Sequence, residues 1–323
     1  MAESVAASRR DVGESSFSQG WRLFKSAIIF IFRKPAFLIP IFISWVVVGA
    51  VTFYIRYWWI YPDSNGLFFL ELFGFILLMT YVIFVANLML LELIKQLEDD
   101  QQVSFGKALA ATISSDSIKV IPLAIFFAIA WFIIVIIQAL TRKSRRNRAE
   151  PSLRDAAQTL AGIPGGLSVN PFSWLRLGLR MFEKMLRMTI FLALPAIAWE
   201  HEGSFSAFKK AVSIVKKYPL QFLSEYGLTL VAGTIMAIPL IIIFLLDSLG
   251  QSTGGTLPNI IWYWVIFYEG VIWTLGIYLE QMSMALLYLW QMKYESNGNT
   301  PDLSTFNKPD LLENLRALKS SQI

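Results

Sequence analysis

The chain has 323 residues, of which 55% are hydrophobic and only 16% are charged. This composition is too apolar for a soluble domain, whose surface needs more polar side chains, so the excess must face lipid. The absence of cysteine excludes disulfides and cysteine-based metal or nucleophilic sites, and a single histidine leaves little basis for zinc or non-haem iron chemistry.

Six apolar segments follow a polar start. Residues 1–15 have no apolar core, so we expect a disordered N-terminus without a secretory signal. The predicted transmembrane domain, 16–294, contains the apolar segments 36–54, 67–93, 120–140, 188–199, 220–246 and 260–292. All but the fourth reach the length that a helix needs to cross the hydrocarbon core. The sequence predicts an all-α fold, a polytopic transmembrane helix bundle with about six membrane segments and basic amphipathic interfacial helices.

The fourth segment, 188–199, is short and contains Pro195. It either spans by borrowing residues from the amphipathic stretch 172–187, or it dips into the membrane and returns.

A serine followed by phenylalanine precedes the first, third and fifth segments, at Ser16, Ser104 and Ser204. Serine can cap a helix N-terminus, and the spacing of apolar residues after each serine is typical of an amphipathic helix. In the third copy we expect one apolar face, composed of Phe205, Phe208, Val212 and Val215. The pattern predicts an internal repeat whose basic helices lie in the lipid headgroups.

Lysine and arginine counts set the expected topology. The net charge of +5 is typical of a membrane protein with basic cytoplasmic loops, rather than of nucleic-acid binding. The counts place both termini in the cytoplasm of a multi-pass inner-membrane protein. The basic connection 141–187 breaks the pattern, because its ten lysine and arginine residues would lie outside if every segment spans. Six spans and four spans plus a re-entrant pair both stay open.

The tail, 295–323, changes composition after a turn at 297–301. Leu311, Leu312, Leu315 and Leu318 predict a short amphipathic helix in the cytoplasm.

Polar residues within apolar segments are the first functional candidates, because a carboxylate in hydrocarbon must be neutralised or paired. They are Asn87, Glu92, Glu225, Glu269 and Glu280. Glu269 and Glu280 are eleven residues apart, so they share a helix face. They form either a proton or cation relay, or hydrogen bonds to neighbouring helices and to Tyr263, Tyr268 and Tyr278. No set of intramembrane cations is evident to complete a transport path, which favours the second alternative.

Basic residues beside the apolar segments are candidates for contact with lipid headgroups or with a protein partner. They are Arg142, Lys143, Arg145, Arg146, Arg148, Lys209, Lys210, Lys216 and Lys217. We find no catalytic group, metal site or cofactor motif, and the turn Glu200-His201-Glu202 does not have the spacing of metal ligands.

Two stretches carry a family resemblance: Phe84-Val-Ala-Asn87 with Leu97 to Phe105, and Ala193 to Glu200 with Gly203 to Lys210. They resemble a broad prokaryotic family of multi-span proteins and, more distantly, the membrane domains associated with glycerophosphoryl diester phosphodiesterases and the YciC-type inner-membrane proteins. The likeness covers residues 17–294. It implies a six-helix membrane domain with a cytoplasmic N-terminus and no assigned activity.

The first functional hypothesis is a non-enzymatic integral membrane protein that acts through protein partners or anionic lipids, as a scaffold or accessory subunit, with homo-oligomerisation also open. A small transporter or channel using the intramembrane carboxylates is the alternative. An enzyme acting on lipid ranks third.

Overall fold

A computed structural model describes most of the chain between Trp21 and Ser296. The described residues are 21, 24–25, 27–32, 34–60, 62, 64–98, 103–141, 171–252 and 257–296. Within them the structure is helical and has no strand. The predicted N-terminal disorder, the cluster from Arg142 to Arg148 and the tail helix lie outside the described residues.

The helices follow one another with short connections wherever both sides are described. After helical residues between Trp21 and Phe32 come η1 (Pro35–Leu38), α2 (Ile39–Tyr57), α3 (Asn65–Glu98), α4 (Phe105–Ala111), the π-helical turn η2 (Thr112–Asp116), α5 (Ser117–Thr141), α7 (Pro171–Glu200), α8 (Ser204–Lys217), α9 (Pro219–Ser252) and α10 (Asn259–Ser296). Five helices, α2, α3, α5, α9 and α10, contain stretches long and apolar enough to cross a membrane. The predicted all-α polytopic bundle is confirmed.

Helix α7 contains the short fourth segment. It is one continuous helix of 30 residues, about 45 Å long, and it includes residues 172–187 as well as the apolar part. The stretch Ile190–Ala198 is almost completely buried, because α7 packs against α3, α5, α8 and α10. Most of the polar residues of α7 lie in its first half instead, where Met181, Phe182 and Met185 are exposed. The basic connection that we assigned to 141–187 is therefore helical from Pro171 onward.

The helices form three similar units. Each unit has a shorter helix and then two long helices that contact each other: residues 21–32 with α2 and α3, α4 with α5 and α7, and α8 with α9 and α10. The serine-phenylalanine pairs at 104 and 204 lie at the start of the shorter helices of the second and third units, and the pair at Ser16 lies outside the described residues. Ser104 caps α4, its hydroxyl accepting a hydrogen bond from the Lys107 amide at 3.5 Å. Ser204 differs, because its hydroxyl donates to the carbonyl of Lys119 at the start of α5.

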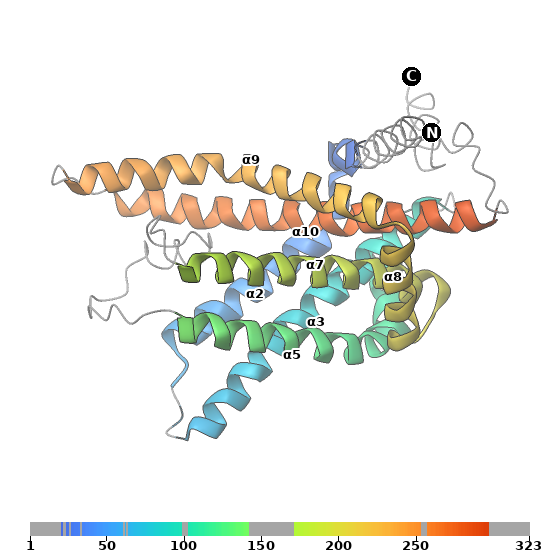
Figure 1. Cartoon of the computed structure of the whole chain (residues 1–323), viewed down its shortest axis with the longest axis horizontal. Coiled ribbons are helices and arrows are strands. Elements are labelled where there is room, and N and C mark those ends of the chain that lie inside the picture. The colour runs from blue at the N-terminus through green and yellow to red at the C-terminus, as the bar shows by residue number, and fades with distance from the viewer. Residues whose placement is uncertain are drawn as a thin grey trace, which may run out of the picture.

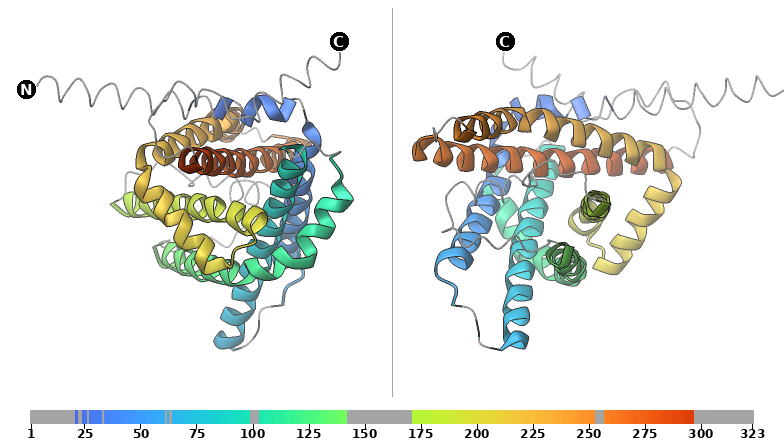
Figure 2. Two further views of the ribbon diagram at one scale, coloured as in Figure 1. Left: turned by 90° about the vertical axis from the view of Figure 1, so that its right-hand side faces the viewer. Right: turned by 60° about the vertical axis from the view of Figure 1, so that its left-hand side comes forward.

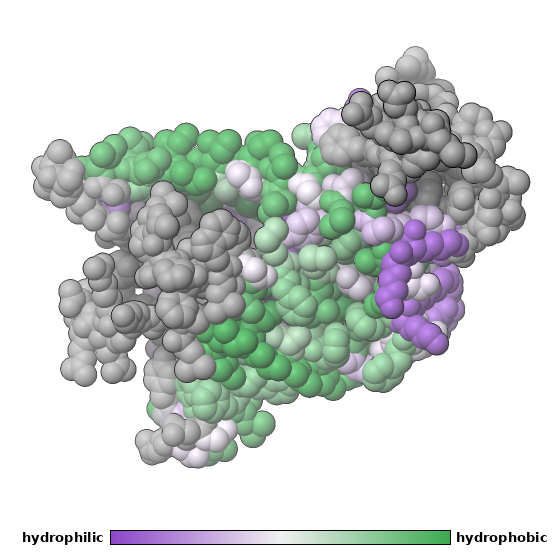
Figure 3. All heavy atoms as spheres, in the orientation of Figure 1, coloured by the Kyte–Doolittle hydropathy of each residue, from purple (hydrophilic) through white to green (hydrophobic). Residues whose placement is uncertain are grey.

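One end of the bundle is defined by α8, which crosses the ends of the long helices there (Figures 1 and 2). We call it the α8 end; α7 and α10 finish there and α9 begins there. The opposite end, called the far end, holds the connections between α2 and α3 and between α9 and α10. Hydrophilic residues gather over α8, whereas α9 and the lower face are mostly apolar (Figure 3). The exposed side chains of α9 include Leu230, Val231, Ile235, Ile242 and Leu245, which suit lipid contact.

Candidate functional site

An ion-pair cluster lies inside the bundle where α7 meets α10. The Arg187 guanidinium donates two hydrogen bonds to the Glu280 carboxylate, from Nε to Oε2 at 2.8 Å and from Nη2 to Oε1 at 3.1 Å. Lys184 Nζ lies 3.5 Å from the same carboxylate, and Glu183 lies 3.7 Å from Arg187. The expectation that the bundle lacks cations is wrong. The sequence analysis assigned Lys184 and Arg187 to the basic connection 141–187. Because α7 begins at Pro171, both residues lie on this helix, opposite Glu280.

These four side chains neutralise one another. Two carboxylates and two cations give no net charge, and the two-point contact between Arg187 and Glu280 is the strongest geometry for such a pair. A neutral, tightly paired cluster holds α7 and α10 together. This arrangement favours the structural role for Glu280 over a role in a relay.

Helix α9 adds a second buried carboxylate. Both oxygens of Glu225 are buried and have no hydrogen-bond partner among the described residues, although Ser283 of α10 faces them. The next residue, Tyr226, places its ring 5.1 Å from Lys184 Nζ, and its hydroxyl is also buried without a partner among the described residues. Tyr226 thus contacts the ion-pair cluster, whereas Glu225 faces Ser283.

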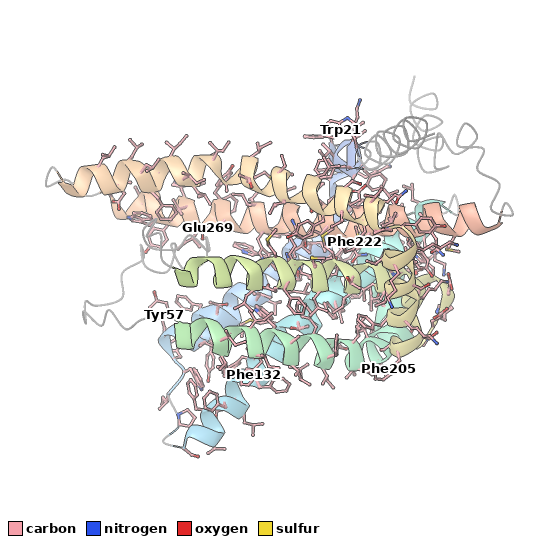
Figure 4. The ribbon with its side chains drawn as sticks, in the orientation of Figure 1. Trp21, Tyr57, Phe132, Phe205, Phe222 and Glu269 are labelled. Atoms are coloured by element: carbon pink, nitrogen blue, oxygen red, sulfur yellow. The ribbon has the colours of Figure 1, made fainter. Side chains whose placement is uncertain are left out.

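The remaining intramembrane candidates lie apart from this cluster. Glu269 is on the same helix as Glu280 but nearer the far end (Figure 4), and its buried oxygens have no partner among the described residues. Asn87 of α3 is buried and donates to the Ile83 carbonyl of its own helix at 2.8 Å. Glu92 of α3 is half-buried. The structure therefore pairs Glu280 with α7 and places Glu225 against Ser283, three residues after Glu280 on α10.

The tyrosines that we expected to bind the carboxylates do not do so. Tyr268 donates to the Met236 carbonyl at 3.1 Å, the Tyr278 hydroxyl is buried without a described partner, and the Tyr263 side chain is exposed.

A third polar group lies at the α8 end. Glu200, the last residue of α7, accepts hydrogen bonds from Lys210 Nζ and from the Tyr288 hydroxyl, both at 2.5 Å. Burial alone would raise the pKa of Glu200, but the hydrogen bonds from Lys210 and Tyr288 outweigh it and lower the pKa below its usual value. Lys210, one of the predicted lipid contacts, is thus paired within the protein.

The other lysines of α8 point outward. Lys209, Lys216 and Lys217 are exposed, and Phe205 is 81% exposed. The buried face of α8 consists of small residues and one isoleucine: Ser204, Ala207, Ala211 and Ile214. The apolar face that we predicted is therefore divided: Phe208 and Val215 pack against the core of the bundle, whereas Phe205 is exposed.

The helical period explains this outer face. Phe205, Lys209, Val212 and Lys216 are separated by four, three and four residues, so they lie on one side of α8. Small residues let α8 approach α7 closely, which leaves the phenylalanine and the lysines facing away from the bundle.

Comparison with protein-family models, with curated proteins and with solved structures finds no match.

Proposed function

We propose that this protein is a non-enzymatic integral membrane protein that acts through anionic lipids or a protein partner, as a scaffold or accessory subunit. The observation that supports the proposal is the outer face of α8, where Phe205 is exposed beside Lys209 and Lys216. Aromatic side chains enter the headgroup region and lysines bind anionic headgroups there, so this combination is typical of an interfacial helix.

The proposal includes an orientation in which the α8 end faces the cytoplasm and both termini lie on that side of the cell inner membrane. Lys107, on the shorter helix α4 of the second unit, is also exposed. Cytoplasmic segments carry an excess of lysine and arginine, and the inner leaflet supplies anionic lipid.

The lipid contact can be measured by native mass spectrometry of the detergent-solubilised protein, titrated with phosphatidylglycerol or with phosphatidylcholine. Each lysine near an anionic surface contributes about 1 kcal/mol, so changing Lys209, Lys216 and Lys217 to glutamine should lower the preference for the anionic lipid by up to about a hundredfold. The matched control changes the same three residues to arginine, which keeps the charge and should keep the preference. An unchanged preference in the glutamine variant, with no loss of any co-purifying protein, would contradict the proposal.

The orientation can be tested directly because the natural chain has no cysteine. A single cysteine at Lys209 should react with a membrane-impermeant maleimide only after the cells are broken open. A single cysteine at Ser64, in the connection between α2 and α3, should react in intact spheroplasts. The reverse result would place the α8 end outside.

A small transporter or channel is the second candidate, and the observation that favours it is Glu269, whose buried oxygens have no partner among the described residues. A spanning protein leaves such carboxylates unpaired chiefly where they bind an ion or a proton. Flux of a small ion across proteoliposomes that is lost in Glu269→Gln would support this function over the first.

A further inference from the structure

A histidine and a buried aspartate meet at the α8 end, apart from the ion-pair cluster of α7 and α10. His201, the single histidine of the chain, lies in the turn between α7 and α8. Its Nδ1 is 3.5 Å from Oδ1 of Asp116, the last residue of the π-helical turn η2. The Asp116 side chain is 6% exposed and the His201 side chain is 58% exposed. This contact joins the α7–α8 turn to the second unit.

Both residues lie where the backbone departs from the ordinary α-helix. Asp116 ends a π-helical turn, a rare feature that is frequent at functional sites. His201 has a φ of 55° and is the only residue other than glycine with a positive φ in the described part of the chain. Helices commonly end on a glycine in this conformation, because glycine adopts it without steric cost. The histidine ring offsets that cost with a contact that glycine cannot make.

Lys119, near the start of α5, attaches the same turn through two hydrogen bonds. Its Nζ donates to the His201 carbonyl at 3.3 Å and lies 3.6 Å from the Asp116 carboxylate. Its carbonyl accepts a hydrogen bond from the hydroxyl of Ser204, the first residue of α8. We call these contacts of Asp116, Lys119, His201 and Ser204 the latch. Of the side-chain types in the latch, only imidazole ordinarily changes its charge between about pH 5 and 8.

The charges around His201 favour a proton on its ring. In the described part of the chain, the charged or titratable side chains that contact His201 or belong to or contact its two neighbours in sequence come from η2, α5, α7, the turn itself, α8 and α10. They are Asp116, Lys119, Glu200, Glu202, Lys210 and Tyr288. Three carboxylates and two lysines give a net charge of −1 when the tyrosine is neutral. A proton on His201 brings this charge to zero and makes the contact with Asp116 an ion pair.

The latch holds the first turn of α8, where its outer face begins. Phe205 follows Ser204 directly and is exposed at the α8 end (Figure 4), and Lys209 is one helical turn further on. The remainder of α8 is fixed separately, because Ala207, Ala211 and Ile214 are buried against the bundle. A change in the latch therefore acts on the position of Phe205 more than on the whole helix.

We infer that the latch is a pH-sensitive switch for the outer face of α8. When His201 carries a proton, its ion pair with Asp116 fixes the first turn of α8. When the pH rises through the range in which imidazole titrates, the proton leaves for water, the ion pair is lost and the first turn opens more often. Only an N–H bond of the ring breaks. The effect on lipid rests on the proposed function, whereas the movement of α8 does not.

Hydrogen–deuterium exchange of the full-length protein in phosphatidylcholine nanodiscs tests the movement without any anionic lipid. Protection factors correct for the effect of pH on the intrinsic exchange rates. For the peptide 201–208, the protection factor should be about two- to fivefold higher at pH 5.5 than at pH 8, the range expected for an ion pair that solvent partly screens. Residues 209–217 provide the internal reference, which should change less. A protection factor of 201–208 that is equal at both pH values would overturn the inference.

Three variants assign the pH dependence to the ion pair. Asp116→Asn keeps the histidine but removes the carboxylate, so the pH dependence of 201–208 should disappear. His201→Asn is neutral and tolerates a positive φ, so it should fold and show the lower protection at both pH values. Glu202→Gln is the matched control, because it removes a carboxylate of the same turn that pairs with Lys210, and it should behave as the wild type does. PH dependence that persists in folded Asp116→Asn would refute the role of the ion pair.

The lipid titration with phosphatidylglycerol and phosphatidylcholine, repeated at pH 5.5 and pH 8, tests the consequence for the outer face. The preference of the wild type for the anionic lipid should be about two- to fivefold higher at pH 5.5. The charge on His201 alone would raise the preference in Asp116→Asn as well, so an equal rise in both proteins separates the latch from lipid contact and overturns that part. No preference at either pH, together with pH-dependent exchange, contradicts the proposed function and supports the latch alone.

Discussion

The ion pair between α7 and α10 predicts that removing the Glu280 carboxylate destabilises the protein more than removing the Arg187 guanidinium. Glu280 has two cations, whereas Arg187 has Glu280 at 2.8 Å and only a longer contact with Glu183 at 3.7 Å. Glu280→Gln leaves both Lys184 and Arg187 without their main partner. Arg187→Gln leaves Glu280 with Lys184 at 3.5 Å.

The magnitudes follow from the burial of the pair. Removing one partner of a buried ion pair costs about 3 to 5 kcal/mol, because the other charge is left uncompensated. We expect Glu280→Gln to lie in this range and Arg187→Gln to cost about 1 to 3 kcal/mol, since Lys184 still neutralises the carboxylate. A double variant with methionine at both positions should be more stable than Glu280→Gln, because it leaves one cation, Lys184, without the Glu280 carboxylate instead of two.

Reversible unfolding in mixed micelles, followed by tryptophan fluorescence, measures these free energies. The cycle needs Glu280→Gln, Arg187→Gln and the variant that carries both of these changes under one set of conditions, since the coupling energy is the cost of that double variant minus the costs of the two singles. If Arg187→Gln is as destabilising as Glu280→Gln, or if the coupling energy is close to zero, Lys184 does not share the carboxylate and the description of the cluster is incorrect.

Three further predictions concern the packing and pH response of the bundle. A Cβ atom at Gly270 would overlap the ring of Trp45, so Gly270→Ala should destabilise the contact between α2 and α10 by about 1 to 3 kcal/mol in the same unfolding assay. Gly276→Ala is the control: nothing lies within 4 Å of a Cβ atom there, so this change should be neutral or slightly stabilising. Ala211→Leu places a large side chain between α8 and the bundle, so limited proteolysis should cut near α8 faster than in the wild type, and equal rates would contradict the packing. The folded-state pKa of Glu200 is lowered, so its contribution to stability is present above the unfolded-state pKa and is lost as the pH falls through the lower folded-state value. Glu200→Gln should remove that acid-side loss from the pH dependence of unfolding.

The sequence predicts the long apolar helices well because the bilayer imposes one strong requirement on them. Each needs a continuous apolar stretch of about 20 residues, and α2, α3, α5, α9 and α10 meet it. The three-unit arrangement was also predictable, since each unit begins with a serine and a phenylalanine that precede an amphipathic stretch.

Helix α7 and the ion pairs could not be predicted in the same way. The length of α7 depends on its being covered by other helices, and composition alone does not reveal that cover. Lys184 is four residues before Met188, so it reads as part of a basic flank until its partner on α10 is known. One signal was available: Glu183 and Arg187 have the spacing of an ion pair on a helix, which would have extended α7 backward.

The buried face of α8 shows a different limit. Hydrophobicity alone favours burial of Phe205, yet the structure leaves it exposed and buries Ala207 and Ala211. In a membrane the apolar side chains gain nothing by leaving lipid for protein, so close packing of small residues decides which face meets the bundle. The more hydrophobic side is then available to the headgroup region, where a soluble protein would have buried it.

The ion pairs with Glu280 also change the count of lysine and arginine residues from which topology is predicted. A lysine or arginine orients a membrane protein by staying in the aqueous phase or among the headgroups. Lys184 and Arg187 do neither, because they are held by Glu280 within the bundle. Of the ten cations that oppose six spans, these two no longer count. The continuous helix α7 and the contact between α5 and α7 give the second unit the same pair of long helices as the first and third. A re-entrant pair would break that pattern, so the repeat agrees with six long helices, whereas the eight remaining cations of the connection still count against six spans.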